Sequence, residues 1–196
     1  MVDLIDEAAR LGAFLDSHGL RFCIIGGLAV QWWGEPRLTR DIDISLLTGF
    51  GAESGPVDLL LGAYAPRIAD ARQFALANRV LLLRTPGGTG IDISLAALPY
   101  EELAIGRASL LELLPGRMLR LCSAEDLVVM KLFAGRDTDI RDARSVAVRQ
   151  AERLDWGYVG EHLAELADLA EDPGLMLRLR RLRDGLPPAP APSTCR

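Results

Sequence analysis

The stretch RFCIIGGLAVQWWGEPRLTRDIDISL, residues 21–46, contains a strand, a turn, a helix and a second strand in succession. The apolar run at 21–25 predicts a short buried strand, which the pair Gly26-Gly27 ends. A helix is predicted to begin on these glycines and to stop after residue 33, where Gly-Glu-Pro follows. Paired glycines at a helix N-terminus let backbone N–H groups approach a phosphate, and the helix dipole favours the anion. The first half of the stretch therefore predicts a phosphate-binding turn.

The second half carries two aspartates on one face of a strand. Residues 39–47 alternate, and a period of two places Asp41 and Asp43 on the same face. Further along, the segment 80–95 predicts a hairpin, with Asp92 on its second strand. Aligned carboxylates bind hard divalent cations through oxygen. A third carboxylate on a neighbouring strand would complete a site for two Mg²⁺ ions, which lie about 3.5–4 Å apart in two-metal enzymes.

Each piece alone has an ordinary explanation, because a Gly-Gly pair is usually a turn and Asp-Ile-Asp is usually an exposed strand face. Together, in this order and spacing, they resemble the signature of the DNA polymerase β-like nucleotidyltransferase superfamily. The segments at 26–46, 121–146 (LCSAEDLVVMKLFAGRDTDIRDARSV) and 154–159 (LDWGYV) look like AbiEii-type nucleotidyltransferases. These include the toxins of type IV-like toxin–antitoxin systems in Arg-rich actinobacterial genomes. The resemblance covers most of residues 20–160.

The resemblance implies a role for each matching residue. Gly26 and Gly27 would cradle the triphosphate, and Asp41 and Asp43 would bind the metals. Asp92 would be the third metal ligand and would activate the acceptor hydroxyl, although the match around it is shorter.

The resemblance also assigns roles outside the aspartate strands. Lys131, the one lysine among 22 basic residues, falls where this branch carries a helix lysine that faces the nucleotide phosphates; the alternative is a lysine that extends from an apolar helix to solvent. Asp139 and Asp142 would orient basic groups of the site, or they could support a helix start. Arg40 could contact the nucleotide phosphates or be solvated. Thr39 occupies a position where some relatives carry a hydroxyl that is phosphorylated under antitoxin control, and a strand-start threonine is the alternative.

The implied fold is α/β, a minimal nucleotidyltransferase fold in which helices flank a mixed sheet. We expect a catalytic domain at 1–115, with a helix or helix pair at 100–114. A mainly helical lobe at 116–185 would follow and close over the nucleotide. The Pro-rich segment 186–196 predicts a disordered tail.

The expected reaction is Mg²⁺-dependent transfer of a nucleoside monophosphate from an NTP to an acceptor hydroxyl, with release of pyrophosphate. The resemblance favours RNA as the acceptor, the 3′ end of tRNA in particular, and implies a cognate antitoxin protein as a partner. One alternative is a small-molecule nucleotidyltransferase that modifies an aminoglycoside or a lincosamide. A second is a catalytically weak module that acts through protein contacts.

The charge distribution bears on the acceptor. A net charge of −5 and a pI near 5.1 exclude a uniformly basic protein that coats nucleic acid. Local basic groups could still bind RNA phosphates, and the candidates are Arg67, Arg72, Arg79, Arg84 and the arginines within 178–183. The acidic segment 154–177 could instead form a pocket for a cationic drug.

The sequence also bears on the cellular compartment. No run approaches the roughly 18 apolar residues of a membrane span, and the N-terminus is acidic where a signal peptide would be basic. The three cysteines have neither disulfide nor zinc spacing. We therefore expect a cytoplasmic protein with no membrane partner.

Overall fold

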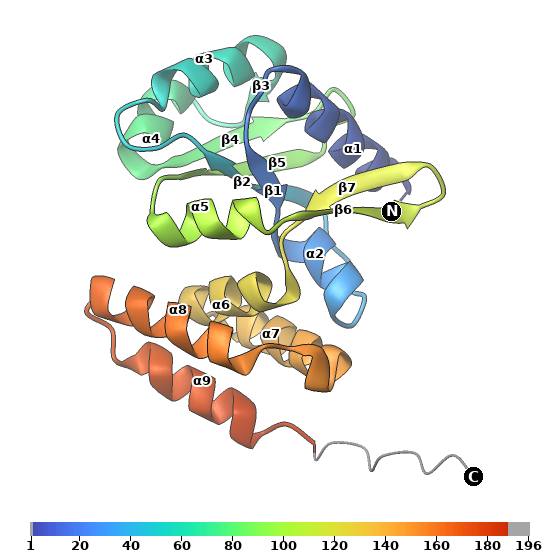
Figure 1. The fold of residues 1–196 in the computed structure, drawn as a ribbon. Helices are drawn as coiled ribbons and strands as arrows, with labels where there is room; N and C mark the ends of the chain where they lie inside the picture. Colours follow the sequence, from blue (N-terminus) through green and yellow to red (C-terminus); the bar gives the residue numbers. More distant parts are fainter. Residues whose placement is uncertain (1, 188–196) are drawn as a thin grey trace. The chain divides into compact units, whose positions relative to one another are not determined.

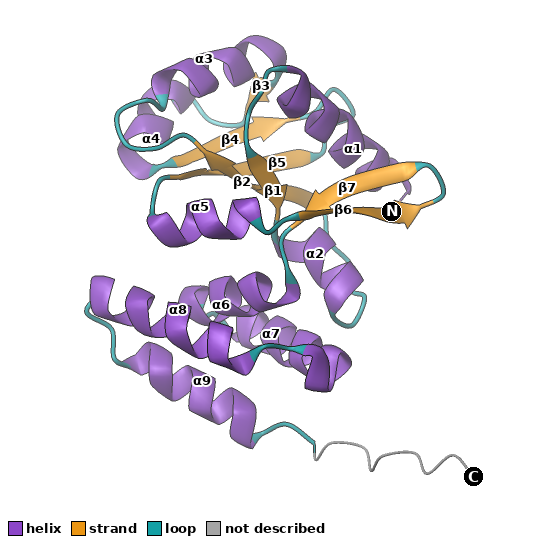
Figure 2. Cartoon of the chain, in the orientation of Figure 1, coloured by secondary structure: helices purple, strands orange, loops and turns teal. Residues whose placement is uncertain are grey.

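A computed structural model describes residues 2–187, which form two compact units (Figures 1 and 2). The first comprises the chain up to Trp32 and Arg37–Ser123, and the second comprises Trp33–Pro36 and the chain from Ala124. Residue 1 and residues 188–196, which include most of the predicted tail 186–196, lie outside the described residues.

The first unit is an α/β body around a mixed seven-stranded sheet of order β3-β4-β5-β2-β1-β7-β6. β2 is parallel to β5 and β1 is parallel to β7, whereas the other neighbours are antiparallel. Its elements are α1 (Val2–Ser17), β1 (Phe22–Ile24), α2 (Gly26–Trp33), β2 (Asp41–Leu47), α3 (Ser54–Ala63), β3 (Ala65–Pro66), α4 (Ala71–Asn78), β4 (Val80–Arg84), β5 (Gly90–Ala96), α5 (Pro99–Gly106), β6 (Ser109–Leu114) and β7 (Arg117–Leu121).

The two faces of this sheet differ because the strands alternate. Ile42 and Ile44 of β2 and their partners Ile91 and Ile93 of β5 are fully buried. They form one core with apolar residues of α1, α3 and α4. Figure 1 shows α5 on the other side of the sheet. The opposite face of β2 and β5 carries the polar residues, so burial of the isoleucines directs the aspartates away from the core.

Much of this unit matches the sequence-based expectations. The strand, glycine pair, helix and strand at residues 21–46 are β1, α2 and β2, and the predicted hairpin is β4 with β5. The α/β class with a mixed sheet is confirmed.

The helix expected across 100–114 is wrong in its second half. Only Pro99–Gly106 is helical, and residues 109–114 form β6, which pairs with β7. The predicted domain boundary at 115 falls in the turn of this hairpin, where Gly116 has a φ of +75° that favours glycine. Leucines are good helix formers, but β7 pairs with β1, and residues 109–114 pair in turn with β7 and so join the sheet.

The second unit is helical in the described residues, as expected. It consists of α6 (Ala124–Ala134), α7 (Asp137–Gln150), a 3₁₀ turn (Ala151–Arg153), α8 (Trp156–Leu169) and α9 (Gly174–Asp184). Gly135 follows α6 with a φ of +67°, and Asp155 caps α8 by accepting a hydrogen bond from the Tyr158 N–H at 3.0 Å. No helix among residues 2–187 has the length and apolar character needed to cross a membrane.

Candidate functional site

The aspartate site rests on two neighbouring strands with nearly the same sequence. β2 reads Asp-Ile-Asp-Ile-Ser from Asp41, and β5 reads Gly-Ile-Asp-Ile-Ser from Gly90. The strands pair in parallel register, with Asp41 opposite Gly90 and Asp43 opposite Asp92. The three predicted carboxylates therefore lie on one face of adjacent strands. The repeated pattern is a signal in the sequence for this pairing.

Three glycines lie against these carboxylates. A Cβ at Gly26 would lie 2.0 Å from Oδ2 of Asp43, and a Cβ at Gly90 would lie 2.1 Å from Oδ1 of Asp41. Gly26 has a φ of +61°, and the Gly27 N–H donates to Oδ2 of Asp43 at 3.3 Å. The predicted glycine pair thus meets the predicted aspartate strand. Phosphate binding by these glycines stays a prediction.

Arg67, which directly follows β3, bridges two of the three aspartates. One guanidinium nitrogen bonds to Oδ1 of Asp92, and another lies 3.8 Å from Oδ1 of Asp41. The Arg67 side chain is 23% exposed, and its Nε is buried without a hydrogen-bond partner among the described residues. Sequence reasoning placed Arg67 on an RNA-binding surface because no local pattern connects it to residues 25 positions away. The structure places it in the carboxylate site.

The electrostatics of Asp92 follow from this arrangement. Burial raises the pKa of Asp92 above the ordinary aspartate value, the Arg67 charge opposes that rise, and the nearby Asp41 charge adds to it. The net result is a carboxylate with a raised pKa, which accepts a proton more readily than an ordinary aspartate.

The chemistry of the donor set fits a divalent metal. Three carboxylates supply only oxygen ligands, as Mg²⁺ requires, and their charge already holds one cation, the guanidinium of Arg67. Between residues 2 and 187, the conformation does not gather three His, Cys, Asp or Glu side chains closely enough to hold a metal. Asp41, Asp43 and Asp92 are thus candidate ligands in a conformation in which Arg67 engages two of them.

The other predicted residues of the first unit lie beside this face. The side chain of Thr39 packs against Gly27, since a Cβ there would lie 2.3 Å from the threonine Oγ1. Thr39 is partly exposed and Arg40 is exposed. Roles for Thr39 in regulation and for Arg40 in nucleotide binding stay predictions.

Lys131 belongs to a separate, buried cluster in the second unit. Its Nζ lies 2.8 Å from Oδ1 of Asp139 and 2.9 Å from Oδ2 of Asp142. Arg136 bonds to the other oxygen of Asp139 at 2.5 Å. The lysine side chain is 10% exposed and the two aspartates are 1% and 4% exposed, so Lys131 does not extend to solvent. The cluster joins α6 to α7, and nucleotide binding by Lys131 or Asp139 stays a prediction.

The charges in this cluster stabilise one another. Burial acts to raise the pKa of Asp139, but hydrogen bonds from Arg136 and Lys131 outweigh burial and hold that pKa below the ordinary value. Asp139 and Asp142 thus hold Lys131 in place, and a part for these aspartates in a nucleotide site stays a prediction.

Half of the eight arginines proposed for RNA contact form ion pairs, Arg67 among them. Arg72 forms an ion pair with Asp58 at 2.6 Å, Arg79 pairs with Glu53, and Arg178 pairs with Asp172 at 3.4 Å. The carboxylates neutralise these arginines, so fewer of the arginines proposed from the sequence are available to contact RNA phosphates.

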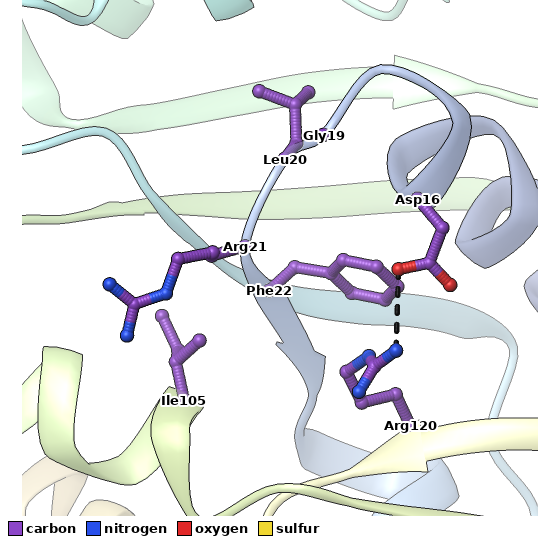
Figure 3. A pocket seen from close by; sticks show the side chains of 7 residues that line it. All are labelled: Asp16, Gly19, Leu20, Arg21, Phe22, Ile105 and Arg120. Atoms are coloured by element: carbon purple, nitrogen blue, oxygen red, sulfur yellow. Dashed lines mark hydrogen bonds and ion pairs between the residues drawn. The ribbon is translucent and has the colours of Figure 1, made fainter.

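A pocket of about 330 Å³ lies at the start of β1, at the end of that strand opposite to Gly26 (Figure 3). Its Arg120 pairs with Asp16 at 3.3 Å and lies over the ring of Phe22, and its Arg21 pairs with Glu102 at 2.7 Å. Both cations are satisfied, so this pocket adds no candidate chemistry.

Comparison with known proteins supports the enzyme class that the sequence predicts. The family model described as a nucleotidyltransferase of unknown function (DUF6036) matches residues 102–176. This match covers less than half of the chain and includes Lys131 but none of the three aspartates of the sheet. No curated protein matches the sequence at a significant level.

Two solved structures share the fold over nearly the whole chain. An antigenic nucleotidyltransferase-like protein from Paracoccidioides brasiliensis aligns over 90% of this chain and 92% of its own, with a TM-score of 0.53 and 20% identity. The antibiotic-resistance factor ANT(2'')-Ia aligns over 92% of this chain and 97% of its own, with a TM-score of 0.52 and 19% identity. The family match confirms the predicted enzyme class, a nucleotidyltransferase, and the two solved structures show the shared fold.

Proposed function

We propose that this chain transfers a nucleoside monophosphate from an NTP to a hydroxyl of RNA, with the 3′ end of tRNA as the acceptor. The observation that carries the proposal is the register of β2 and β5, which aligns Asp41, Asp43 and Asp92 on one face beside Gly26 and Gly27. In the reaction, the acceptor oxygen forms a bond to the α-phosphorus of the NTP. The bond from that phosphorus to the bridging oxygen breaks, and pyrophosphate leaves with the electron pair.

The residues of the site have distinct tasks in this reaction. Asp41, Asp43 and Asp92 would hold two Mg²⁺ ions, and these ions would supply neutralisation of phosphate charge. Asp92 takes the proton of the acceptor hydroxyl, because its partly exposed carboxylate lies beside Asp43 on the neighbouring strand. Gly26 and Gly27 would cradle the triphosphate beside the carboxylates. Catalysis then arises from positioning and electrostatic stabilisation.

The biological role that we propose is that of the toxin of a toxin–antitoxin pair acting in the cytoplasm. Its support is the resemblance of residues 26–46 and 121–146 to AbiEii-type nucleotidyltransferases. A cognate antitoxin would oppose the activity. Phosphorylation of Thr39 would be one route, because a phosphate there adds negative charge against Gly27, two residues before Asp41.

The second candidate is transfer to a small molecule. It is favoured by the shared fold with an antibiotic-resistance factor. A cationic drug would need an acidic pocket, whereas a cavity of about 640 Å³ in the second unit is lined by three arginines and one glutamate. That lining favours an anionic acceptor. A purely binding module has the least support, since all three carboxylates are present and aligned.

The test is an incubation of the pure protein with Mg²⁺, each of the four α-³²P-labelled NTPs, and total tRNA. We expect label on tRNA with at least one NTP, and no label when EDTA removes the metal. Asp41→Asn should abolish labelling, whereas the matched control Asp58→Asn, an exposed carboxylate of the same unit, should retain it. Label on an aminoglycoside or lincosamide but not on tRNA would establish the second candidate instead.

A further inference from the structure

A group of three arginines on one helix stripe stands apart from the paired arginines of this chain. Arg141, Arg144 and Arg149 of α7 line the cavity of about 640 Å³ in the second unit. The remaining lining residues are Glu35, Pro36, Ser145 and Val148. The α7 positions lie three, four, seven and eight residues after the first arginine, so all of them project from one side of the helix.

The wall of this cavity is held in place by hydrogen bonds. The Glu35 N–H donates to Oγ of Ser145 at 3.3 Å, and Arg149 donates to the carbonyl of Gly34. Just beyond, the side chain of Gln150 donates to the carbonyl of Trp33 at 2.7 Å. Residues 33–36 are thus tied to α7 at several points, and the cavity is a built feature of this unit.

The charge of the cavity is not neutralised from within. Across residues 2–187, none of the three arginines forms an ion pair, and the single carboxylate of the lining, Glu35, forms none either. Arg141 and Arg144 are neighbours on the helix surface, where like charges destabilise a helix by a few tenths of a kcal/mol. An uncompensated cation group in a chain of net charge −5 indicates an anionic ligand.

The length of the group narrows the class of that ligand. From Arg141 to Arg149 the helix rises by about 12 Å, at 1.5 Å per residue. A nucleic-acid strand presents successive phosphates along such a length, so each guanidinium group can meet a phosphate of its own. Guanidinium forks also match phosphate oxygens in geometry. Val148, exposed between the arginines, would meet the less polar ribose and base surface.

We propose that this arginine cavity binds the phosphate backbone of the acceptor RNA, an inference that rests on the proposed function. The contacts would be independent of sequence, because they go to phosphates and not to base edges. Recognition would thus come from a part of the chain that the sequence-based set of arginines did not include.

The test measures binding of fluorescent tRNA to the full chain by anisotropy, without NTP or metal, at several KCl concentrations. The variant Arg141→Ala/Arg144→Ala spares Arg149, which holds Gly34. We expect its Kd to rise about tenfold. The slope of log K against log salt should fall by about 1.4, which corresponds to two lost phosphate contacts at 0.7 each. Arg141→Lys/Arg144→Lys should recover most of the affinity, because the charge remains.

The matched control is Arg21→Ala/Arg72→Ala, which removes two exposed arginines that are paired with Glu102 and Asp58. It has the same change in net charge and should bind tRNA as the unmodified chain does. Equal weakening in both double variants would overturn the proposal, since net charge alone would then explain the loss. Competition by millimolar NTP that depends on the cavity arginines would also overturn it in favour of a nucleotide site.

This experiment separates the inference from the proposed function. Binding is measured without catalysis, so Asp41→Asn should bind tRNA normally even though it transfers nothing. Intact, cavity-dependent RNA binding together with absent labelling would refute the transfer reaction alone. If the cavity variant still labelled tRNA and bound it with unchanged affinity, the role of the cavity in RNA binding would be refuted and the transfer reaction would stand.

Discussion

Two clusters of aspartates with a basic partner occur in this chain, and they differ in exposure. On β2 and β5, Arg67 engages Asp41 and Asp92, whose side chains are 50% and 41% exposed, and Asp43 lies on the same face. Between α6 and α7, Lys131 and Arg136 bind Asp139 and Asp142, which are almost fully buried. Solvent ions can reach the carboxylates of the first cluster, whereas the carboxylates of the second are enclosed. Access to solvent therefore distinguishes a candidate reaction site from a structural ion-pair network.

The largest expected effect is on catalysis. Asp43→Asn removes a carboxylate that the first cluster needs for metal binding, and we expect labelling of tRNA to fall by about 10³-fold, the scale of losing one electrostatic stabiliser. Stability should change little, because the variant also relieves repulsion among three like charges. Activity within tenfold of the unmodified chain would show that Asp43 is not part of the reacting site.

The next effect is on folding. Lys131→Met leaves Asp139 and Asp142 buried without their shared cation, and we expect the free energy of unfolding, measured with urea, to fall by about 3–5 kcal/mol. The control is Arg136→Met, whose side chain is 75% exposed and should cost less than about 1 kcal/mol. If Lys131→Met instead abolished labelling and left stability intact, the second cluster would be part of the reaction site.

A smaller effect is expected on metal affinity. Arg67→Ala removes the guanidinium that engages Asp41 and Asp92. A metal ion then binds these carboxylates without first displacing the guanidinium group. We expect Mn²⁺ to bind about tenfold more tightly, a change of about 1.4 kcal/mol by calorimetry without NTP. The comparison variant Arg72→Ala should bind the metal normally. Weaker binding after loss of Arg67 would contradict competition between guanidinium and metal.

The smallest effect is a pH dependence of stability. The pKa of Asp139 is lower in the folded chain than the unfolded value of about 3.9, so its stabilising contribution is complete above that value and is lost as pH falls through the folded pKa. Urea unfolding between about pH 3 and 5.5 should show stability that declines with acid. Asp139→Asn should have a shallower decline, and an equal slope in both proteins would exclude this residue as the source.

Local patterns in the sequence determined the face of β2 that carries aspartates and the position of the glycine turn. A strand with a period of two leaves only two faces, and burial of the isoleucines decides between them. The chain turns from β1 into α2 at Gly26, whose positive φ favours glycine. The helical second unit was likewise readable from its 3.6-residue periodicity.

Only the tertiary structure decided which charges meet. Arg67 and Asp92 are 25 residues apart, and no periodicity links them. Arg72 and Arg79 have carboxylate partners that distant segments supply, whereas Arg141 and Arg144 have none among the described residues, although all four look alike in the sequence. The same holds for residues 109–114, whose helix-forming leucines enter a sheet through pairing with β7. Local sequence determines which way a side chain points within its own element, but its partner depends on contacts between distant segments, which form only when the chain folds.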